Sequence, residues 1–455
     1  MLNILPLRAQ QARSFTKMRK SLIAVTQLNC KEDKSENLAA CSKLIEKAAF
    51  NRAKAIFLPE NCDYIAPDSE SVVAMAEPLD GDLIREYQRL AKKFDIWISV
   101  GGFHQKIANR EEKRMKIKNT HVLISSDGSI ASEYDKIHLF DVSIPEEGVH
   151  LKESAMCDPG VEIKEPVNTP FGNVALGVCY DLRFPEMAQA HAALGADILT
   201  FPSAFTVATG MAHWEPLLRA RAIETQCYVI AAAQTGKHNP KRISYGHAMV
   251  VDPWGAIIAQ CSEGVGIAFA EVDLDYLKSV RTRIPVQSHK RPDIYLEKFS
   301  RQSPLPENDA EYQFGQVTLK GEIIFYVTKY TMAFVNLKCV VPGHVLVSPI
   351  RPALRIENMD ACETTDLFLT VKKVQAVLEK VHETTSSTMS IQDGVDAGQT
   401  IRHVHVHVLP RKMGDFERPD DIYNHIHKHD KTDEKPSRSR EDMVEECKQL
   451  RKYFC

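Results

Sequence analysis

Three imidazoles alternate with three valines in one short segment: His403, Val404, His405, Val406, His407 and Val408. In an extended strand, side chains two positions apart share one face. We therefore expect the segment 401–409 to be a strand whose valines pack on a core while its imidazoles meet a ligand. Pro410 cannot donate a backbone hydrogen bond, so it is expected to end this strand.

Three kinds of chemistry fit such a row. Purely structural histidines are disfavoured, because filling a core does not require strict alternation. Zinc is the second interpretation, since strand-borne histidines are good ligands, but no nearby Cys or acidic residue stands at the spacing of a fourth ligand. The third is phosphate chemistry, in which one neutral imidazole is the nucleophile and its neighbours donate to phosphate oxygens.

A second set of reactive side chains lies in the N-terminal half. Cys179, Glu60 and Lys136 each follow a short apolar segment that is typical of a buried strand. Open α/β sheets place their ligand sites at the carboxyl ends of strands. A nucleophile, a base and a cation are the minimum set for acyl transfer. Taken singly, the three could equally be a buried thiol, a surface carboxylate and a solvated ammonium group.

The elements that must position these residues can be read from the hydrophobic pattern. Between residues 21 and 295, short apolar strands alternate with amphipathic helices. The predicted strands are 22–27, 55–58, 96–101, 121–125, 174–178, 196–201 and 228–232, and the predicted helices are 35–52 and 214–225. Segments 121–134 and 247–260 share a strand–turn–strand pattern, which indicates two similar α/β halves packed sheet to sheet.

A smaller unit follows a polar, proline-containing linker at 298–313. From residue 314 we expect strands near 322–326, 331–336 and 344–348, a helix near 364–384, and then the histidine strand. The polar stretch 428–440 is expected to be mobile. Ser439 should cap a last helix, whose buried side would carry Met443, Cys447, Leu450 and Phe454.

The composition bounds the function classes. With 455 residues, 44% hydrophobic and 26% charged, the chain has the makeup of a globular protein of more than one domain. A net charge of −3 gives no sign of a nucleic-acid or membrane partner. The 11 cysteines form no C-x-x-C pair, so we expect mostly buried thiols in a reducing compartment such as the cytoplasm.

Residues 1–20 are basic and apolar, with Arg8, Arg13 and Arg19 among them and no acidic residue. This composition suits a mitochondrial transit peptide, and a disordered leader is an equal alternative.

The C-terminal part resembles the fragile-histidine-triad branch of the histidine-triad family. The likeness rests on the histidine segment and on surrounding blocks at 314–316, 340–344, 392–394, 397–400 and 410–412. It implies an α+β domain over 314–455 that hydrolyses dinucleoside polyphosphates, with His405 attacking the α-phosphorus of diadenosine triphosphate. Val395 and Asp396 depart from the family's Pro and Glu, away from these roles.

The same resemblance implies roles for the other residues. His403 would orient the nucleophile, and His407 would contact phosphate near the leaving oxygen. The remaining binding residues implied are Asn336, His344, Gln392 and Gln399. No tightly bound cofactor or metal site is implied, although Mg²⁺ or Mn²⁺ can accompany the nucleotide. His425, His427 and His429 repeat the spacing without the apolar alternation, and we do not expect them to form a site.

The N-terminal part resembles the nitrilase superfamily and, within it, the Nit branch of amide hydrolases. The contexts of Glu60, Lys136 and Cys179 carry the likeness, together with the segments 202–205, 245–247 and 252–255. It implies an αββα sandwich over 21–297 in which Glu60 accepts the thiol proton and Cys179 attacks an amide carbonyl. Glu153 fits best as a second catalytic glutamate, and Glu146 and Glu147 lie close to it in an apparently lengthened loop.

Together the two resemblances predict a two-domain, bifunctional hydrolase that combines an N-terminal α/β sandwich with a C-terminal α+β domain. Its expected partners are a dinucleoside polyphosphate and a small amide, and the Nit branch implies deaminated glutathione as the amide substrate. Neither a nucleic acid nor a membrane is expected, and a homotetramer is implied. A different class of function stays open: a signalling protein that binds the dinucleotide on a nitrilase-like oligomerisation platform.

Overall fold

The computed structural model describes residues 20–107, 116–144, 149–292, 294–295, 303–429 and 437–454. The chain divides into two compact units, Met1–Lys290 and Arg291–Cys455. The predicted leader at 1–20 lies outside the described residues except for Lys20. None of the described helices is long and apolar enough to cross a bilayer.

The first unit contains a sheet in the order β13-β12-β1-β2-β3-β4-β5, with β16 also paired to β1. Its strands are β1 (Lys20–Leu28), β2 (Ala55–Phe57), β3 (Trp97–Lys106), β4 (Ile117–Ile124), β5 (Ile130–Asp135), β12 (Ala233–Lys237), β13 (Ile243–Tyr245) and β16 (Gly266–Asp273). β1, β2 and β3 run parallel, so the chain leaves β1 and β2 at the same edge.

A second sheet in this unit has the order β15-β14-β11-β10-β9-β8. Its strands are β8 (Val167–Thr169), β9 (Gly172–Leu176), β10 (Ile198–Thr200), β11 (Tyr228–Ala231), β14 (Met249–Val251) and β15 (Ile257–Gln260). The two predicted strand–turn–strand segments are confirmed as the β4–β5 and β14–β15 hairpins. They lie in different sheets, as two similar halves require.

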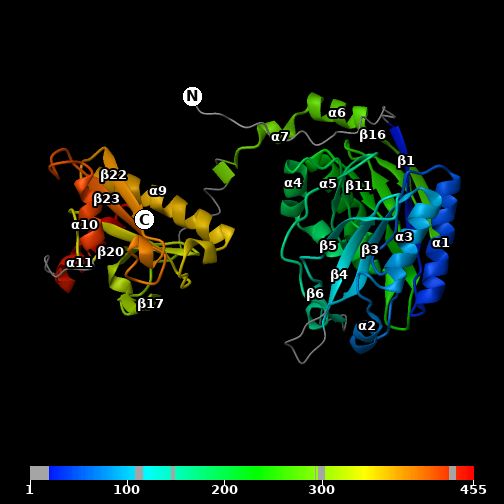
Figure 1. The fold of residues 1–455 in the computed structure, drawn as a ribbon, viewed down its shortest axis with the longest axis horizontal. Coiled ribbons are helices and arrows are strands. Elements are labelled where there is room, and N and C mark those ends of the chain that lie inside the picture. Colours follow the sequence, from blue (N-terminus) through cyan, green and yellow to red (C-terminus); the bar gives the residue numbers. More distant parts are fainter. Residues whose placement is uncertain are drawn as a thin grey trace. The chain divides into compact units, whose positions relative to one another are not determined.

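The helices cover the outer faces of the two sheets (Figure 1). On the first sheet lie α1 (Lys34–Phe50) and α3 (Asp82–Phe94), and on the second lie α4 (Pro185–Ala193) and α5 (Val207–Thr225); α2 (Ser69–Met75) lies at one end of the strands. α6 (Leu274–Arg283) and α7 (Val286–His289) end the unit. The predicted αββα sandwich is therefore confirmed.

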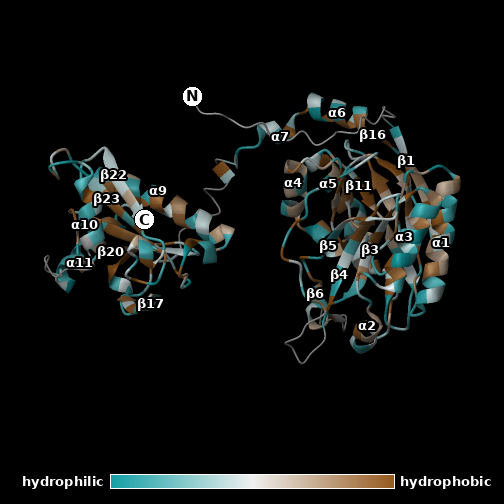
Figure 2. Ribbon diagram, viewed as in Figure 1, coloured by the Kyte–Doolittle hydropathy of each residue, from teal (hydrophilic) through white to brown (hydrophobic). Residues whose placement is uncertain are grey.

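Two apolar cores hold these layers together. The hydrophobic colouring follows the strands of the two sheets, which lie between the helix layers (Figure 2). One core joins the two sheets to the helices on the second sheet and includes Phe57, Leu176 and Trp214; the other joins α1 and α3 to the first sheet through Ile45 and Tyr87. Burying a side chain of this size contributes roughly 1.5–3 kcal/mol. The sheets are thereby fixed closely enough to position side chains at their edges.

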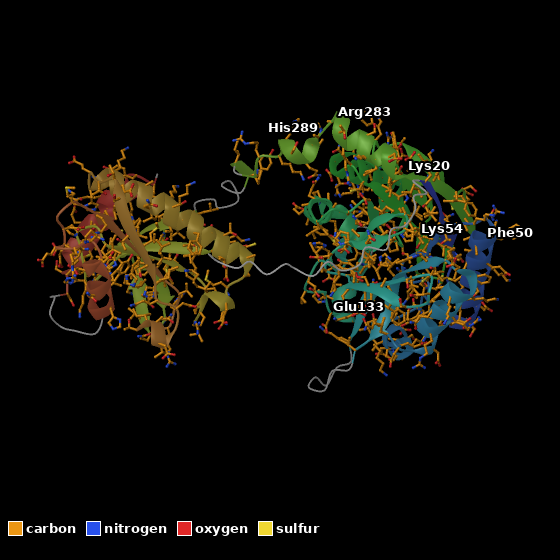
Figure 3. The ribbon with its side chains drawn as sticks, turned by 45° about the horizontal axis from the view of Figure 1, so that its top comes forward. Lys20, Phe50, Lys54, Glu133, Arg283 and His289 are labelled. Atoms are coloured by element: carbon orange, nitrogen blue, oxygen red, sulfur yellow. The ribbon has the colours of Figure 1, made fainter. Side chains whose placement is uncertain are left out.

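The alternation of exposed and buried residues along β5 explains why the charged side chain of Lys136 is buried. Glu133 is exposed on the outer surface (Figure 3), whereas its neighbour Tyr134 is buried. Lys136, two positions after Tyr134, is also buried and follows the end of the strand. This period-two pattern carries the lysine stem inward rather than into solvent. Other labelled positions in Figure 3, such as Phe50 at the end of α1, are exposed.

The second unit is an α+β domain, as predicted. Its main sheet has the order β19-β20-β21-β23-β22, formed by β19 (Ile324–Val327), β20 (Thr331–Val335), β21 (Val345–Pro349), β22 (Ser386–Ile391) and β23 (Val406–Arg411). The hairpin of β17 (Glu311–Phe314) and β18 (Val317–Lys320) precedes it. The helices are α9 (Ala361–Val381), α10 (Asp421–His429) and α11 (Arg440–Arg451).

Several local expectations for this unit are confirmed and one boundary differs. Ser439 caps α11, and Met443, Cys447, Leu450 and Phe454 are buried against the sheet. β17 starts at Glu311, so the last residues of the expected linker 298–313 are a strand. Residues 430–436 of the polar stretch lie outside the described residues.

The prediction that all three histidines lie on one strand is wrong. β23 begins at Val406, so only His407 of the three is in it. The backbone N–H of His403 donates to Ile401, and that of Val404 to Ala353, which takes both away from the ladder. Pro410 does not end the strand either: it pairs with Ser387, where β23 contacts β22 alone and therefore tolerates a missing donor.

Candidate functional sites

Cys179 sits on a sharp bend between β9 and the short 3₁₀ helix η3 (Cys179–Arg183). Its φ of 45° lies in the left-handed region, which is unusual for a non-glycine residue and marks a constrained position. Its N–H donates to the Pro202 carbonyl at 2.9 Å. Asp181, fully buried, accepts from the Val178 N–H at 2.9 Å and from His138 at 2.7 Å, which holds the bend.

Glu60 enters the same region from the loop after β2. Gln234 donates to the carbonyl oxygens of both Glu60 and Asn61, at 3.0 and 3.1 Å. Opposite this loop, Gly102 has a φ of 60°, and a Cβ there would lie 2.6 Å from Glu60 Cγ. The close approach of the two segments therefore depends on glycine at this position.

Lys136 connects the two predicted glutamates. Its Nζ lies 3.0 Å from Glu60 Oε1 and 2.9 Å from Glu153 Oε2, and the lysine side chain is 2% exposed. Glu153, at the start of the 3₁₀ helix η2 (Glu153–Ala155), also accepts from the Phe140 N–H at 2.7 Å. The structure thus brings Glu60, Lys136 and Glu153 together. Glu146 and Glu147 lie outside the described residues.

Burial and charge set the protonation states of this cluster. Burial alone would raise the pKa of Glu60, but Lys136 and Arg242 outweigh it and hold that pKa below its usual value. Burial alone would lower the pKa of Lys136, yet the carboxylates of Glu153 and Glu60 keep it well above its ordinary value. Burial, reinforced by the charge of Glu60, raises the pKa of the Cys179 thiol.

These states describe a neutral thiol beside an ionised carboxylate. The charge of Glu60 acts on the Cys179 thiol and helps to raise its pKa, so the two groups are close enough for Glu60 to serve as proton acceptor when the sulfur attacks. Lys136 supplies a fixed positive charge close to the negative charge that develops. The backbone N–H of Ala204 also favours the thiolate. This arrangement fits nucleophilic attack on a carbonyl carbon.

Asn119 is a member of this cluster that the sequence analysis missed. Its Nδ2 donates to Glu60 Oε1 and to Glu153 Oε1, each at 3.0 Å. A polar residue inside the buried strand β4 was the only available signal, and Thr120 and His121 beside it share that property.

In the second unit, the partner of His405 identifies its reactive nitrogen. His405 donates its Nδ1–H to the carbonyl oxygen of His403 at 2.7 Å, since a carbonyl can only accept. In the neutral ring the lone pair is then on Nε2. His405 Nε2 is therefore the nitrogen suited to attack an electrophile.

His403 acts through its main chain rather than through its ring. The ring is fixed on both sides: Nδ1 accepts from the Gly315 N–H at 3.1 Å, and Nε2 donates to the Pro349 carbonyl at 3.0 Å. Burial lowers the pKa of His403, which agrees with a neutral ring. With both nitrogens bonded to backbone groups, this imidazole cannot ligate a metal.

In His407 the two ring nitrogens have the opposite protonation from those of His405. The Val340 N–H donates to His344 Nδ1 at 3.2 Å, so His344 carries its proton on Nε2 and donates to His407 Nδ1 at 2.9 Å. The proton of His407 is then on Nε2. Neighbouring rings, with centroids 5.0 Å apart, thus offer one acceptor and one donor.

A cavity of about 180 Å³ opens beside these two rings. It is mainly apolar, and its lining includes Phe314, Phe334, Leu346, Asn336, His405 and His407. Phe314 packs edge-on against His405, with ring centroids 5.3 Å apart. Asn336 Nδ2 lies 3.3 Å from His344 Nε2. An apolar pocket that ends in polar groups suits a flat, partly polar ligand.

The two predicted glutamines are placed differently. Gln392 follows β22, whose Ile391 pairs with Val406, so it continues toward the level of His405. The side chain of Gln399 instead accepts from the Gly394 N–H at 2.9 Å and donates to the Leu354 carbonyl at 3.1 Å. Gln399 therefore joins its own loop to the segment that contains Leu354.

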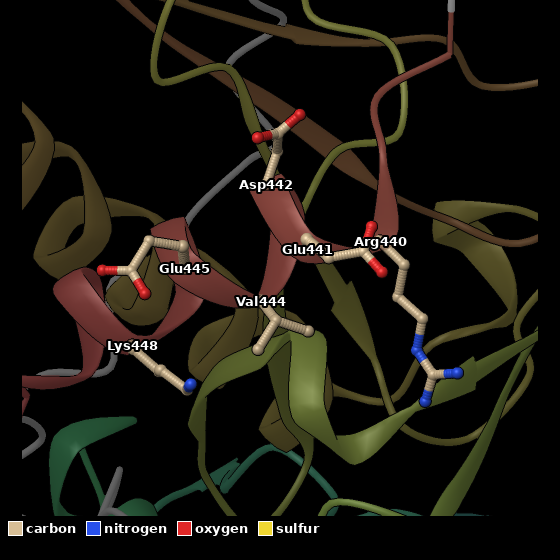
Figure 4. Close-up of a pocket in the computed structure, with 6 residues that line it drawn as sticks. All are labelled: Arg440, Glu441, Asp442, Val444, Glu445 and Lys448. Atoms are coloured by element: carbon tan, nitrogen blue, oxygen red, sulfur yellow. The ribbon is translucent and has the colours of Figure 1, made fainter.

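The other candidate features give weaker support for a functional site. His425 and His427 are exposed on α10, a helix, so the repeated spacing does not put them on one face. Among the residues described, no group of three or more His, Cys, Asp or Glu side chains is arranged to hold a metal ion. A hollow on α11 is lined by that single helix (Figure 4) and lacks a nucleophile.

Comparisons with known proteins find a family for each of the two units. Residues 22–282 match the carbon–nitrogen hydrolase family, and residues 320–414 match the HIT domain. The chain is 48% identical to the nitrilase and fragile histidine triad fusion protein NitFhit of Caenorhabditis elegans, over 93% of this chain and 95% of that protein. The crystal structure of the C. elegans NitFhit protein matches with a TM-score of 0.59, 46% identity, and coverage of 95% of this chain and 99% of that chain.

The N-terminal unit also has relatives that stand alone. Human deaminated glutathione amidase is 51% identical over 60% of this chain and 83% of its own length. The matches to fusion proteins extend over nearly the whole chain in the same domain order. The chain therefore belongs to the family of NitFhit fusion proteins, in which a carbon–nitrogen hydrolase domain precedes a histidine-triad domain.

Proposed function

We propose that the C-terminal domain cleaves diadenosine triphosphate into AMP and ADP through an adenylylated His405. The observation that carries this proposal is the opposite polarity of two adjacent rings, with the lone pair of His405 on Nε2 and the proton of His407 on Nε2. His405 Nε2 attacks the α-phosphorus, the bond to the ADP oxygen breaks, and water then releases AMP. Two displacements replace one difficult step.

The surrounding residues stabilise this reaction by charge and position. His407 donates to phosphate near the leaving oxygen, and His344 holds His407 in the donor state. Asn336 and the apolar lining bind the nucleoside. Gln392 and Gln399 bind phosphate oxygens, and for Gln399 this requires its loop contacts to rearrange. No cofactor is bound tightly; Mg²⁺ or Mn²⁺ accompanies the nucleotide.

For the N-terminal domain we propose a cysteine-dependent amidase that acts on deaminated glutathione. The supporting observation is the buried ion-pair cluster in which Lys136 lies 3.0 Å from Glu60 and 2.9 Å from Glu153, beside a Cys179 thiol whose pKa the charge of Glu60 helps to raise. The relatives named deaminated glutathione amidase suggest the substrate. Cys179 attacks the amide carbonyl while Glu60 takes its proton, and the amine of cysteinylglycine leaves with that proton.

Water then hydrolyses the thioester to 2-oxoglutarate and the free thiol. Glu153 helps to keep Lys136 charged and in place. We propose in addition that the protein is a homotetramer, which light scattering of the full chain would test.

Paired variants of the full chain test both activities at once. Cys179→Ala should abolish amide hydrolysis and leave nucleotide cleavage unchanged, whereas His405→Asn should do the reverse and retain dinucleotide binding. Each variant is the folded control for the other. Undiminished amidase activity in Cys179→Ala, or undiminished nucleotide turnover in His405→Asn, would refute the corresponding assignment. Full occupancy with turnover no faster than nucleotide dissociation would favour the signalling alternative instead.

A further inference from the structure

Asn119 connects every charged member of the amidase cluster. Its side-chain Nδ2 reaches Glu60 Oε1 and Glu153 Oε1, each at 3.0 Å. Its main-chain carbonyl accepts from the N–H of Lys136 at 2.9 Å. One residue on β4 thus fixes both carboxylates through its side chain and the lysine through its backbone.

The orientation of the Asn119 amide follows from these partners. Ionised carboxylates only accept hydrogen bonds, so the group between them must be the NH₂ group, which has two hydrogens to donate. The amide is 4% exposed, and Gly102 packs closely on its other side, where a Cβ would lie 2.8 Å from Asn119 Oδ1. Rotation of the amide by half a turn would put an oxygen against two negative charges.

The charge balance explains why two neutral donors matter here. Glu60 and Glu153 share one cation, Lys136, so the three side chains carry one net negative charge in a buried site. Two carboxylates near each other favour uptake of a proton by one of them. Donors to both oxygens oppose that uptake without adding charge.

Other titratable groups face the same cluster. The charge of Glu60 helps to raise the pKa of the Cys179 thiol, and Arg242, on the segment between β12 and β13, lowers the pKa of Glu60 through its charge. Cys157 lies close enough that Glu153 and Lys136 shift the pKa of its thiol, although burial is the main reason that this pKa is raised to about 12. Neither Arg242 nor Cys157 donates to both carboxylates in the described contacts.

We propose that Asn119 is a positioning residue that keeps Glu60 ionised, and therefore able to accept the Cys179 proton, while Glu153 holds Lys136. This inference rests on the proposed amidase function. It assigns to a neutral amide a role in setting the pH range of the enzyme, in addition to the role of the acidic and basic residues.

The test is the pH dependence of kcat/KM for deaminated glutathione hydrolysis by the full chain. Asn119→Asp keeps the shape but replaces two donors by acceptors, so the acid limb of the profile should move upward by about one pH unit or more. Asn119→Ser retains one donor and should give a smaller shift in the same direction. If Asn119 has a merely structural role, the variants should lower the maximum value of kcat/KM and leave the acid limb of the pH profile at the same pH. This result would overturn the proposal.

A substrate-free readout separates this inference from the proposed function. The alkylation rate of Cys179 by iodoacetamide, followed against pH by mass spectrometry of its peptide, also depends on the proton acceptor. If the wild type does not hydrolyse deaminated glutathione, the substrate assignment fails. An upward shift of the alkylation profile in Asn119→Asp would still support the positioning role, whereas coincident wild-type and variant profiles would overturn it. Unchanged tryptophan fluorescence, which comes from the first unit alone, shows that this unit remains folded in the variants.

Discussion

His344 Nε2 lies 2.9 Å from His407 Nδ1, and the Val340 N–H lies on the other side of the His344 ring at 3.2 Å. The direction of this chain is fixed at its start, because a backbone N–H can only donate. A main-chain group outside the nucleotide site thus determines which nitrogen of His407 carries the proton.

His344→Leu tests this relay. The variant removes the donor to His407 and leaves the nucleophile His405 in place. Loss of one oriented donor at the developing charge should lower kcat for nucleotide hydrolysis by about 100-fold. Steady-state kinetics with diadenosine triphosphate measures this loss, and the exposed His425→Ala is the matched control. Wild-type kcat in His344→Leu would show that His407 does not need this partner.

Gly315→Ala tests the anchoring of His403. Gly315 has a φ of 58°, and a Cβ there would lie 2.6 Å from Ile401 Cγ2, so the substitution should displace the N–H that bonds to His403 Nδ1. Gly414→Ala is the control: its φ of 84° gives comparable backbone strain, of order 1 kcal/mol, with nothing within 4 Å. Nucleotide hydrolysis should be lost at a lower temperature in Gly315→Ala than in Gly414→Ala. Equal inactivation temperatures would contradict the anchoring role.

Lys136→Met tests the buried charge balance. The variant leaves Glu60 and Glu153 without their cation, and removing one partner of a buried ion pair costs about 3–5 kcal/mol. Amidase activity should disappear, and the loss of stability should shrink in acid as the carboxylates take up protons. Lys116→Met is the control, since its pair with Asp158 is partly exposed and worth about 1 kcal/mol or less. Urea unfolding measures the loss of stability in Lys136→Met and in Lys116→Met. Equal losses in the two variants would contradict the buried charge balance.

Stability of the N-terminal unit should fall in acid because three buried histidines remain neutral. Burial lowers the pKa of His121 from 6.5 to about 4, and the same cause gives about 4 for His191 and His238. The unfolded chain then binds protons that the folded unit does not. Each histidine's contribution is complete above about pH 6.5 and is lost at up to about 1.4 kcal/mol per pH unit down to about pH 4.

His121→Gln should flatten this dependence. All 3 tryptophans of the chain, Trp97, Trp214 and Trp254, lie in the N-terminal unit, so their fluorescence follows its unfolding alone. Urea titrations at pH 7 and pH 5 should show a smaller difference in the variant than in the wild type. An identical difference would mean that His121 does not contribute.

The sequence predicted the strands and the identities of most reactive residues, because those depend on local patterns. The short buried strands that precede Glu60 and Cys179 are visible from a few apolar residues. The histidine segment failed because the backbone donors of His403 and Val404 bond to Ile401 and Ala353, a choice that involves a distant segment. Alternation of residue types could not reveal it.

Asn119 and the loop contacts of Gln399 could not be predicted for a related reason. Asn119 gains its role from segments that supply Glu60, Lys136 and Glu153, which meet only in the folded sheets. Gln399 bonds to a backbone group of its own loop and to one of a distant segment, at Gly394 and Leu354, although the resemblance assigns its side chain to phosphate. A side-chain amide has several possible partners, and packing decides among them.

Chemical quench of a single turnover tests the covalent role of His405 most directly. The full chain, in excess over labelled diadenosine triphosphate, is quenched in alkali, which preserves a phosphorus–nitrogen bond, and its peptides are mapped by mass spectrometry. We expect AMP on the imidazole of His405 before free AMP accumulates, and none in His405→Asn. Release of AMP and ADP at the full rate, without any adenylylated peptide from residues 401–409, would contradict the account.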